Sequence, residues 1–235
     1  MLAIDHLNVS FEKPVLKATT LAVATNSIHG IVGLNGSGKT TLLNAIAGRL
    51  KPDSGSLTFS SKALTNNTVA YLDTENFFYP RITAREYVSV FMLSNPSFPL
   101  EQWNELLELP LDNLIDDFST GMKKKTALLG MLCLKRPLLL LDEPFNGLDL
   151  QTAETLKIIM QQLQQQGTTI VVTSHILETL TSTCNAISHL HNGTMANTWQ
   201  QAQFATMEQD IFKQSREEQS QRISKLLGQQ HEDLT

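Results

Sequence analysis

The segment G-L-N-G-S-G-K-T at residues 33–40 constrains this chain more than any other. It matches the pattern G-x-x-x-x-G-K-[ST], and it stands between an apolar run and a stretch with helical spacing. Gly36 and Gly38 allow the backbone to turn its N–H groups toward a phosphate, and the following helix N-terminus adds about half a positive charge. Lys39 supplies a charge for the β- and γ-phosphates, and the Thr40 hydroxyl is placed to ligate Mg²⁺. The segment therefore predicts a phosphate-binding loop.

Four leucines followed by two carboxylates, at residues 138–143, form the second informative segment. Such a run of leucines predicts a strand that is buried on both faces. The carboxylates follow at the C-terminal end of that strand, where open α/β sheets bind their ligands. We expect Asp142 to hold the water shell of Mg²⁺ and Glu143 to orient and deprotonate an attacking water. The alternative is that the two acidic residues only end the strand and have no role in catalysis. The presence of the loop at 33–40 makes this alternative the weaker one.

Strands alternate with helices along most of the chain. Apolar runs and period-two alternation predict strands at residues 7–11, 20–24, 27–32, 57–59, 69–72, 138–142 and 169–173, and Asn192-Gly193 predicts a hairpin turn. Helical spacing predicts helices over residues 42–50, after Thr83 and Pro99, over 121–135 and over 150–166. Thr83 and Glu86 have the spacing of a capping box. The alternation implies a mainly parallel sheet, and the first strands imply an antiparallel flank.

Composition excludes several other classes of protein. The net charge of −5 argues against a nucleic-acid-binding surface, so no nucleic-acid partner is expected. Cys133 and Cys184 are too few for a disulfide framework and suit a reducing compartment. The longest apolar stretch, residues 127–141, is interrupted by two cations and a proline, and the N-terminus lacks the apolar core of a signal peptide. We expect a soluble, cytosolic protein.

Four motifs resemble those of the nucleotide-binding subunit of an ATP-binding cassette (ABC) transporter, and they occur in that family's order. They are GLNGSGKTT at 33–41, FSTGMKKK at 118–125, LLLLDEPFNGLD at 138–149 and TSH at 173–175. The resemblance covers roughly residues 1–196. It implies an α/β fold: a P-loop NTPase (RecA-like) core with a mainly parallel sheet, an N-terminal antiparallel β flank and a small α-helical subdomain. It also implies that the chain is an ATPase and that ATP and Mg²⁺ are bound.

The resemblance assigns roles to single residues outside the phosphate-binding loop. Phe11 matches the aromatic residue that stacks on adenine, although a strand residue of this kind is also a common core residue. Ser119 and Gly121 match the signature loop, which caps the γ-phosphate bound on the opposite subunit of a head-to-tail dimer. Asp149 matches the loop that crosses the dimer interface, and His175 matches the histidine that contacts the γ-phosphate.

The expected site thus has three groups of residues. Nucleotide binding is assigned to Phe11, Gly33, Asn35, Gly36, Ser37, Gly38, Lys39, Thr40, Thr41, Ser119, Gly121 and Asp149. Metal binding is assigned to Thr40 and Asp142, and catalysis to Glu143 and His175.

Three positions depart from the family pattern. Thr120 replaces a glycine of the signature, which restricts the loop unless Thr120 serves as a helix N-cap. Thr74, beside Glu75, stands where the family has a glutamine, which puts metal contact and γ-phosphate sensing there in doubt. Lys123–Lys125 either strengthen the positive field around the signature or lie on a solvated helix face.

The resemblance also implies partners. One phosphate-binding loop makes the chain half of a two-site dimer, either a homodimer or a heterodimer with a second ATPase subunit. Its work requires transmembrane permease subunits, so we expect a cytoplasmic protein that is peripheral on the cytoplasmic face of a membrane. The DEPFNGLD motif resembles that of exporter-type subunits. The alternative is an ATP-dependent dimerisation switch that regulates a partner protein with little turnover.

The expected organisation is an ATPase domain at 1–196, with the helical subdomain inserted at about 74–118, and a polar, helical C-terminal tail at 197–235. The insertion is the expected point of attachment for the membrane partner. Its aromatic cluster, Phe77, Phe78 and Tyr79, either forms the core of the insertion or lines a groove for a short helix of the transmembrane subunit.

Overall fold

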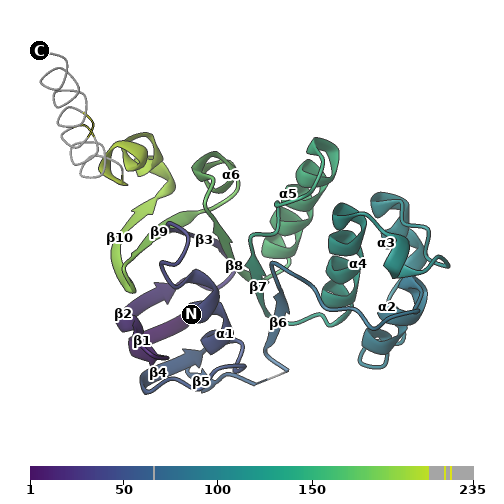
Figure 1. Ribbon diagram of the computed structural model, residues 1–235, viewed down its shortest axis with the longest axis horizontal. Helices are drawn as coiled ribbons and strands as arrows, with labels where there is room; N and C mark the ends of the chain where they lie inside the picture. The colour runs from purple at the N-terminus through teal and green to yellow at the C-terminus, as the bar shows by residue number, and fades with distance from the viewer. Residues whose placement is uncertain (66, 212–219, 221–222, 224–235) are drawn as a thin grey trace, which may run out of the picture.

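The computed structural model describes residues 1–65, 67–211, 220 and 223, which form two β-sheets and the helices around them (Figure 1). The strands of the larger sheet are β3 (Ile28–Val32), β6 (Val69–Leu72), β7 (Leu138–Asp142), β8 (Thr169–Ser174), β9 (Ala186–His191) and β10 (Thr194–Gln200). Their order is β10-β9-β3-β8-β7-β6, and only β10 is antiparallel to its neighbour. The smaller sheet is antiparallel and has the order β2-β1-β4-β5, with β1 (Leu2–Ser10), β2 (Pro14–Val23), β4 (Ser54–Phe59) and β5 (Lys62–Ala63). The predicted parallel core and antiparallel flank are confirmed.

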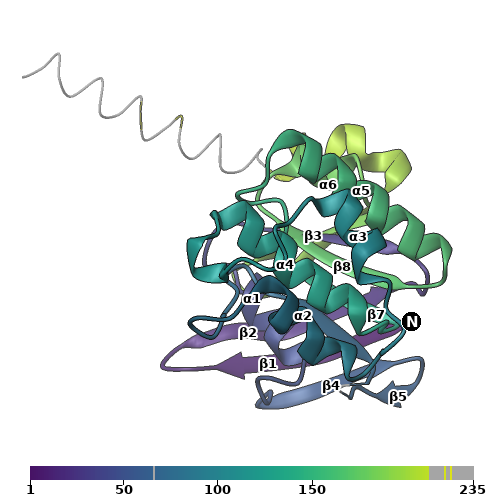
Figure 2. The same cartoon turned by 90° about the vertical axis from the view of Figure 1, so that its right-hand side faces the viewer.

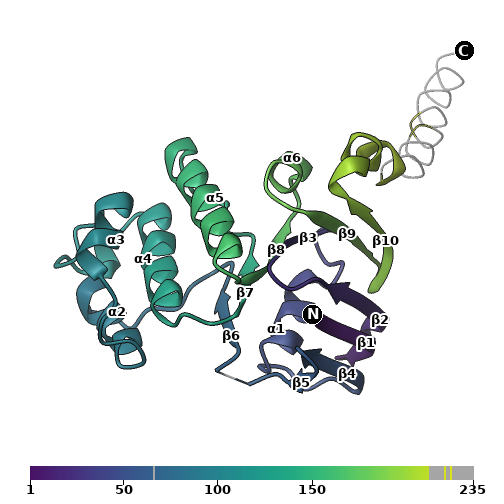
Figure 3. The ribbon, with the colours of Figure 1, turned by 180° about the vertical axis from the view of Figure 1, so that it is seen from behind.

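The helices divide into three groups. They are α1 (Lys39–Ile46), α2 (Ala84–Met92), α3 (Leu100–Leu107), α4 (Thr120–Cys133), α5 (Leu150–Gln165) and α6 (Leu177–Thr181). Helix α1 lies between the two sheets, and α5 and α6 cover the opposite face of the larger sheet (Figure 2). Helices α2, α3 and α4 gather at the β6 end of the molecule, as the view from behind also shows (Figure 3). Within the described residues, no helix has both the length and the apolar character needed to cross a membrane.

The leucines of β7 divide the hydrophobic core into two layers. Leu138 and Leu140 pack with α1 and the smaller sheet, whereas Leu139 and Leu141 pack with the helices on the other face. All four are at most 4% exposed, which confirms the predicted strand with two buried faces. Because both faces of β7 are buried, the strand cannot slide in the sheet, and the positions of Asp142 and Glu143 at its C-terminal end are fixed.

The hairpin between β9 and β10 turns at Asn192-Gly193, as predicted. Both residues have positive φ, 49° and 82°, which a two-residue turn of this kind requires. The tip of the hairpin reaches the smaller sheet, because the Gly193 carbonyl accepts hydrogen bonds from the Lys17 N–H at 2.8 Å and the Thr19 hydroxyl at 2.7 Å. A Cβ at Gly193 would lie 2.1 Å from the carbonyl oxygen of Val15. The contact therefore joins the two sheets and leaves no room for a side chain.

Several element boundaries differ from the prediction: β1 begins at Leu2 rather than at residue 7, and β2 begins at Pro14 rather than at residue 20. Helix α1 ends at Ile46 rather than near residue 50, because Gly48 has φ +72° and leaves the helical conformation. Strand β10 runs to Gln200, past the expected domain boundary at residue 196, and Trp199 within it is buried in the core. Of the expected helical tail at 197–235, residues 212–219, 221–222 and 224–235 lie outside the described residues.

The capping box at Thr83 is confirmed and yields a stability prediction. The Thr83 side chain accepts a hydrogen bond from the Glu86 N–H, and the Glu86 carboxylate accepts one from the Thr83 N–H at 2.8 Å. Thr83→Ala should lower the free energy of unfolding by about 1 kcal/mol, because an N–H of the first turn of α2 loses its partner. Thr83→Ser keeps the hydroxyl and should unfold close to wild type. Urea denaturation of both variants checks this, and equal destabilisation by both would contradict the cap.

Candidate functional site

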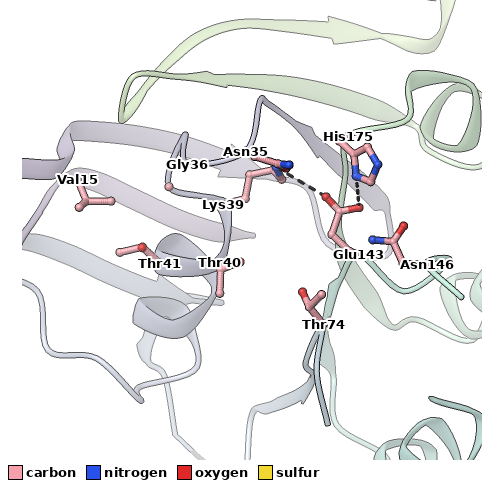
Figure 4. A pocket seen from close by; sticks show the side chains of 11 residues that line it. Val15, Asn35, Gly36, Lys39, Thr40, Thr41, Thr74, Glu143, Asn146 and His175 are labelled. Atoms are coloured by element: carbon pink, nitrogen blue, oxygen red, sulfur yellow. Dashed lines mark hydrogen bonds and ion pairs between the residues drawn. The ribbon is translucent and has the colours of Figure 1, made fainter. Parts of the chain in front are cut away.

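A cavity of about 510 Å³ lies at the C-terminal edge of the parallel strands (Figure 4). The residues that line it are Val15, Asn35, Gly36, Gly38, Lys39, Thr40, Thr41, Thr74, Glu143, Asn146 and His175. They come from β2, from the loop that opens α1, and from the segments that follow β6, β7 and β8. This is the edge at which open α/β sheets bind ligands, and several predicted site residues meet there.

The loop at residues 33–38 has the geometry of an anion cradle. Gly36 and Gly38 have φ of +80° and +106°, as the motif predicts, and no side chain caps the N-terminus of α1. The Ser37 hydroxyl is buried and has no hydrogen-bond partner among the described residues. Gly33 is approached so closely by β9 that a Cβ there would lie 2.5 Å from the Leu190 carbonyl oxygen. Uncapped N–H groups at a helix start are what a phosphate satisfies, so the loop fits that ligand.

Lys39 points into the cavity from the first position of α1 and is only 7% exposed. Its ammonium donates a hydrogen bond to the Gly33 carbonyl at 2.8 Å and lies 3.7 Å from Oε1 of Glu143. The Gly33 carbonyl and the Glu143 carboxylate thus act as partners of the buried Lys39 ammonium, and phosphate oxygens could take their place.

Asp142 is fully buried at the end of β7, and hydroxyl groups surround it. Its Oδ1 accepts from the Thr173 hydroxyl at 2.6 Å, and its Oδ2 accepts from the Thr40 hydroxyl at 2.7 Å and from the Tyr71 hydroxyl at 3.4 Å. Burial and the charge of Asp142 raise the pKa of Tyr71, so the phenol stays protonated as a donor. A hydroxyl and a carboxylate oxygen side by side are the hard ligands that Mg²⁺ prefers, so Thr40 and Asp142 fit such an ion.

Glu143 presents its carboxylate between the side chains of Lys39 and His175. Oε1 faces the Lys39 ammonium, and Oε2 lies 3.0 Å from Nδ1 of His175 (Figure 4). The backbone of Glu143 has φ +48°, in the left-handed region that residues with a side chain rarely adopt. Its N–H donates to the Thr173 hydroxyl at 3.0 Å. The predicted catalytic residues, Glu143 and His175, are therefore in contact, and the carboxylate is 8% exposed beside the cavity.

Other predicted residues lie apart from the cavity. Phe11 follows β1 and is 63% exposed, so the alternative that it is a core residue is wrong, and its stacking on adenine stays a prediction. Ser119 and Asp149 are the N-caps of α4 and α5. Hydrogen bonds from the N–H and hydroxyl of Thr152 hold the pKa of Asp149 below its usual value. A Cβ at Gly121 would lie 2.9 Å from the Gly147 carbonyl oxygen, so the loop that leads to Asp149 packs against the signature segment.

The departures from the family motifs are resolved in part. Ser119, not Thr120, caps α4, so the alternative role for Thr120 as the N-cap is wrong. Thr74 lines the cavity and donates a hydrogen bond to the Asp142 carbonyl at 3.3 Å, whereas Glu75 is exposed and does not line it. The Lys124 ammonium is buried and donates to the Glu143 carbonyl at 2.9 Å, so a solvated helix face is wrong for that lysine.

Sequence reasoning missed three residues around the two carboxylates, Tyr71, Asn146 and Thr173, and it singled out Lys124 only as one of three lysines. The signal for Thr173 is its place at the end of a predicted strand: if that strand lies beside β7, its hydroxyl lies next to Asp142. Asn146 belongs to the DEPFNGLD motif but has no chemistry of its own that marks it. Nothing in the sequence distinguishes Lys124 from the two lysines beside it.

The family model for the ABC transporter matches residues 16–146, more than half of the chain. The chain is 32% identical over 192 residues to the ABC transporter ATP-binding protein YtrB of Bacillus subtilis (strain 168). The matched region covers 78% of this chain and 66% of YtrB. It is similar to the structure of an ATP binding subunit of an ABC transporter, with a TM-score of 0.80, 25% identity, and coverage of 91% of this chain and 92% of that one.

The fold is also that of MJ0796, a bacterial ABC transporter cassette whose structure is dimeric. The TM-score is 0.76 at 20% identity, with coverage of 86% of this chain and 99% of that one. The match to the family model agrees with the four motifs and with the geometry of the loop and strand that carry two of them. The chain therefore belongs to the family of ABC transporter ATPases.

Proposed function

We propose that this chain binds ATP with Mg²⁺ and hydrolyses it, and that it thereby powers the transport of a substrate across a membrane together with separate transmembrane permease subunits. The single observation that carries the proposal is the convergence of Lys39, Thr40 and Glu143 on one cavity, with Asp142 hydrogen-bonded to Thr40. Each has the side chain that phosphoryl transfer to water needs, because catalysis of that reaction is mostly positioning and charge stabilisation.

The residues of the cavity divide the chemical work. Lys39 exchanges its partners in the chain, the Gly33 carbonyl and Glu143, for the β- and γ-phosphate oxygens. Thr40 and Asp142 hold Mg²⁺, which supplies charge neutralisation for the phosphates. Glu143 orients a water molecule and accepts its proton, and His175 holds the Glu143 carboxylate in place and contacts the γ-phosphate.

A head-to-tail dimer completes the proposed site. Ser119 and Asp149 lie exposed at the N-terminal ends of α4 and α5, and Gly121 is in the first turn of α4. The N-terminus of α4 carries positive partial charge, which suits a γ-phosphate presented by a second subunit. Phe11, exposed in the turn between β1 and β2, is available to stack on adenine. The second subunit is either another copy or a related ATPase chain.

The proposed attachment to the permease is a groove of about 210 Å³ between the core and helices α2 and α4. Phe77 lines it, and Phe77 and Tyr79 are 74% and 68% exposed. Phe78 instead packs against Tyr87, with ring centroids 4.9 Å apart. Phe78 therefore belongs to the core of the insertion. Phe77 and Tyr79 are exposed and available to a short helix of the permease.

The proposed organisation follows from these assignments. The ATPase domain, expected at residues 1–196, runs in this proposal to the end of β10 at Gln200, with a helical subdomain at about 74–118 and a C-terminal tail after it. The chain acts at the cytoplasmic face of the membrane, and the DEPFNGLD motif supports an exporter. Thr74, which is too short to copy a glutamine, favours a second candidate, an ATP-dependent dimerisation switch with little turnover. A steady-state ATPase assay with and without the reconstituted permease separates the two.

Replacing Lys39 tests the phosphate assignment. Lys39→Ala removes a charge-assisted contact, so ATP affinity should fall by about 10–100-fold, or about 1.5–3 kcal/mol. Lys51→Ala, at an exposed position that does not line the cavity, should leave the affinity unchanged. Titration calorimetry measures both. Equal ATP affinity in Lys39→Ala and wild type would show that the loop is not the phosphate site.

Replacing Glu143 tests catalysis and assembly together. Glu143→Gln keeps shape and hydrogen bonding but removes the base, so hydrolysis should fall by about 10²–10⁴-fold. ATP should still bind, and a dimer should accumulate on size-exclusion chromatography with ATP and Mg²⁺. Glu105→Gln, at an exposed position of α3 outside the cavity, is the matched control and should keep wild-type turnover. Undiminished hydrolysis by Glu143→Gln would remove Glu143 from the proposed mechanism.

Charge in the groove tests the attachment. Phe77→Asp should abolish co-purification with the permease and the permease-stimulated ATPase activity, because a carboxylate in an apolar contact carries a desolvation cost. Thermal stability and basal ATPase activity of the isolated chain should stay near wild type, since Phe77 is exposed. Phe78→Asp should instead lower the melting temperature. Retained co-purification of Phe77→Asp would place the permease elsewhere.

A further inference from the structure

Lys124 is a buried cation that no motif explains. It lies in the second turn of α4, is 5% exposed, and its ammonium donates a hydrogen bond to the main-chain carbonyl of Glu143 at 2.9 Å. Burial lowers the pKa of Lys124, and the charges of Glu143 and Asp142 act in the opposite direction. Lysines are almost never this buried unless they are paired, so the contact needs an explanation.

The carbonyl that Lys124 contacts belongs to a residue in an unusual conformation. Glu143 has φ +48°, which a residue with a side chain keeps only where its surroundings enforce it. Three hydrogen bonds do so here. The Glu143 N–H donates to the Thr173 hydroxyl at 3.0 Å, and its carbonyl accepts from Lys124 at 2.9 Å and from the Asn146 N–H at 3.2 Å. Of these partners, Lys124 is the one that comes from the helical group at the β6 end of the molecule.

We propose that Lys124 is a positioning residue, which holds the main chain of Glu143 so that its carboxylate faces the cavity. The inference rests on the proposed function, because it assigns the hydrolytic base of that function to Glu143. Lys124 acts through the Glu143 backbone and does not itself line the cavity.

The placement of Lys124 also links two sites. It follows Ser119, the N-cap of α4, by little more than one helical turn, so the two move as one rigid piece of helix. In the proposed dimer the Ser119 end meets the γ-phosphate held by the opposite subunit. A displacement of α4 by that phosphate would reach Glu143 of the same chain through Lys124, and would tie water activation at one site to occupancy of the other.

Kinetics of Lys124→Met test the assignment. Methionine has a similar length and suits a buried position, but it donates no hydrogen bond. We expect kcat for ATP hydrolysis to fall at least tenfold, while the Kd for ATP changes by less than twofold and the melting temperature does not fall. Lys124→Arg keeps a donor and should recover part of the kcat. Lys123→Met is the matched control, since Lys123 is the preceding residue on α4 and its side chain makes no hydrogen bond or ion pair within the described part of the chain.

Mixed dimers of two tagged copies, one of which carries Glu143→Gln, sharpen the test. Lys124→Met on the chain with intact Glu143 should lower turnover, and the same change on the Glu143→Gln chain should not. The reverse pattern would overturn the proposal, because Lys124 would then act on the opposite site. Wild-type kcat in Lys124→Met would overturn it while leaving the proposed ATPase intact. A wild-type chain without ATPase activity, alone or with permease, would overturn both.

Discussion

The hydroxyl groups around Asp142 are the contacts on which the rest of the site depends. A carboxylate that is fully buried is costly unless its oxygens are hydrogen-bonded. Here Thr40 comes from α1, Thr173 from β8 and Tyr71 from β6, so one side chain at the end of β7 joins three other elements. Thr173 then accepts the Glu143 N–H and fixes the next residue as well. The position of the cavity follows from this arrangement, because the same bonds align the helix start with the strand ends.

The two-layered core makes that arrangement rigid. Helix α1 is enclosed between the sheets, with Leu42, Leu43 and Ile46 all fully buried. A helix packed on both sides cannot shift without disturbing both sheets, since interiors are close-packed. The loop at residues 33–38 is therefore attached to a helix that is packed on both sides. Helices α2, α3 and α4, by contrast, contact the larger sheet at its β6 end, which leaves them the part best placed to move relative to the nucleotide.

Local signals were sufficient for much of the fold. The bounds of β6 and β7, the Thr83 cap and the Asn192-Gly193 turn were predicted from residues that stand close together in the sequence. The loop at 33–38 and the place of Glu143 at the strand end beside it follow from motifs combined with the rule for strand ends, whereas the contact between Glu143 and His175 was not predicted.

What could not be predicted depends on contacts between distant segments. The burial of Lys124 and the part played by Tyr71 arise only when α4 and β6 are placed beside β7. The left-handed backbone of Glu143 has no signal either, because glycine rather than glutamate marks such a conformation in a sequence. The sequence presents residues 77–79 as one aromatic cluster. Only the contact with Tyr87 shows that Phe78 is packed while Phe77 and Tyr79 are exposed.

The hairpin tip at Gly193 has a consequence for anyone who engineers this chain. Surface hairpin turns are ordinarily the places where a protein accepts tags, inserted domains or new termini. This turn is different, because the Gly193 carbonyl is bound by β2 and its Cα leaves no space for a side chain. Strand β2 carries Val15 into the nucleotide cavity, and β9 carries the Leu190 carbonyl against Gly33. A label inserted between Asn192 and Gly193 would disturb the contacts that position the loop at residues 33–38, so probes of this protein belong on another turn.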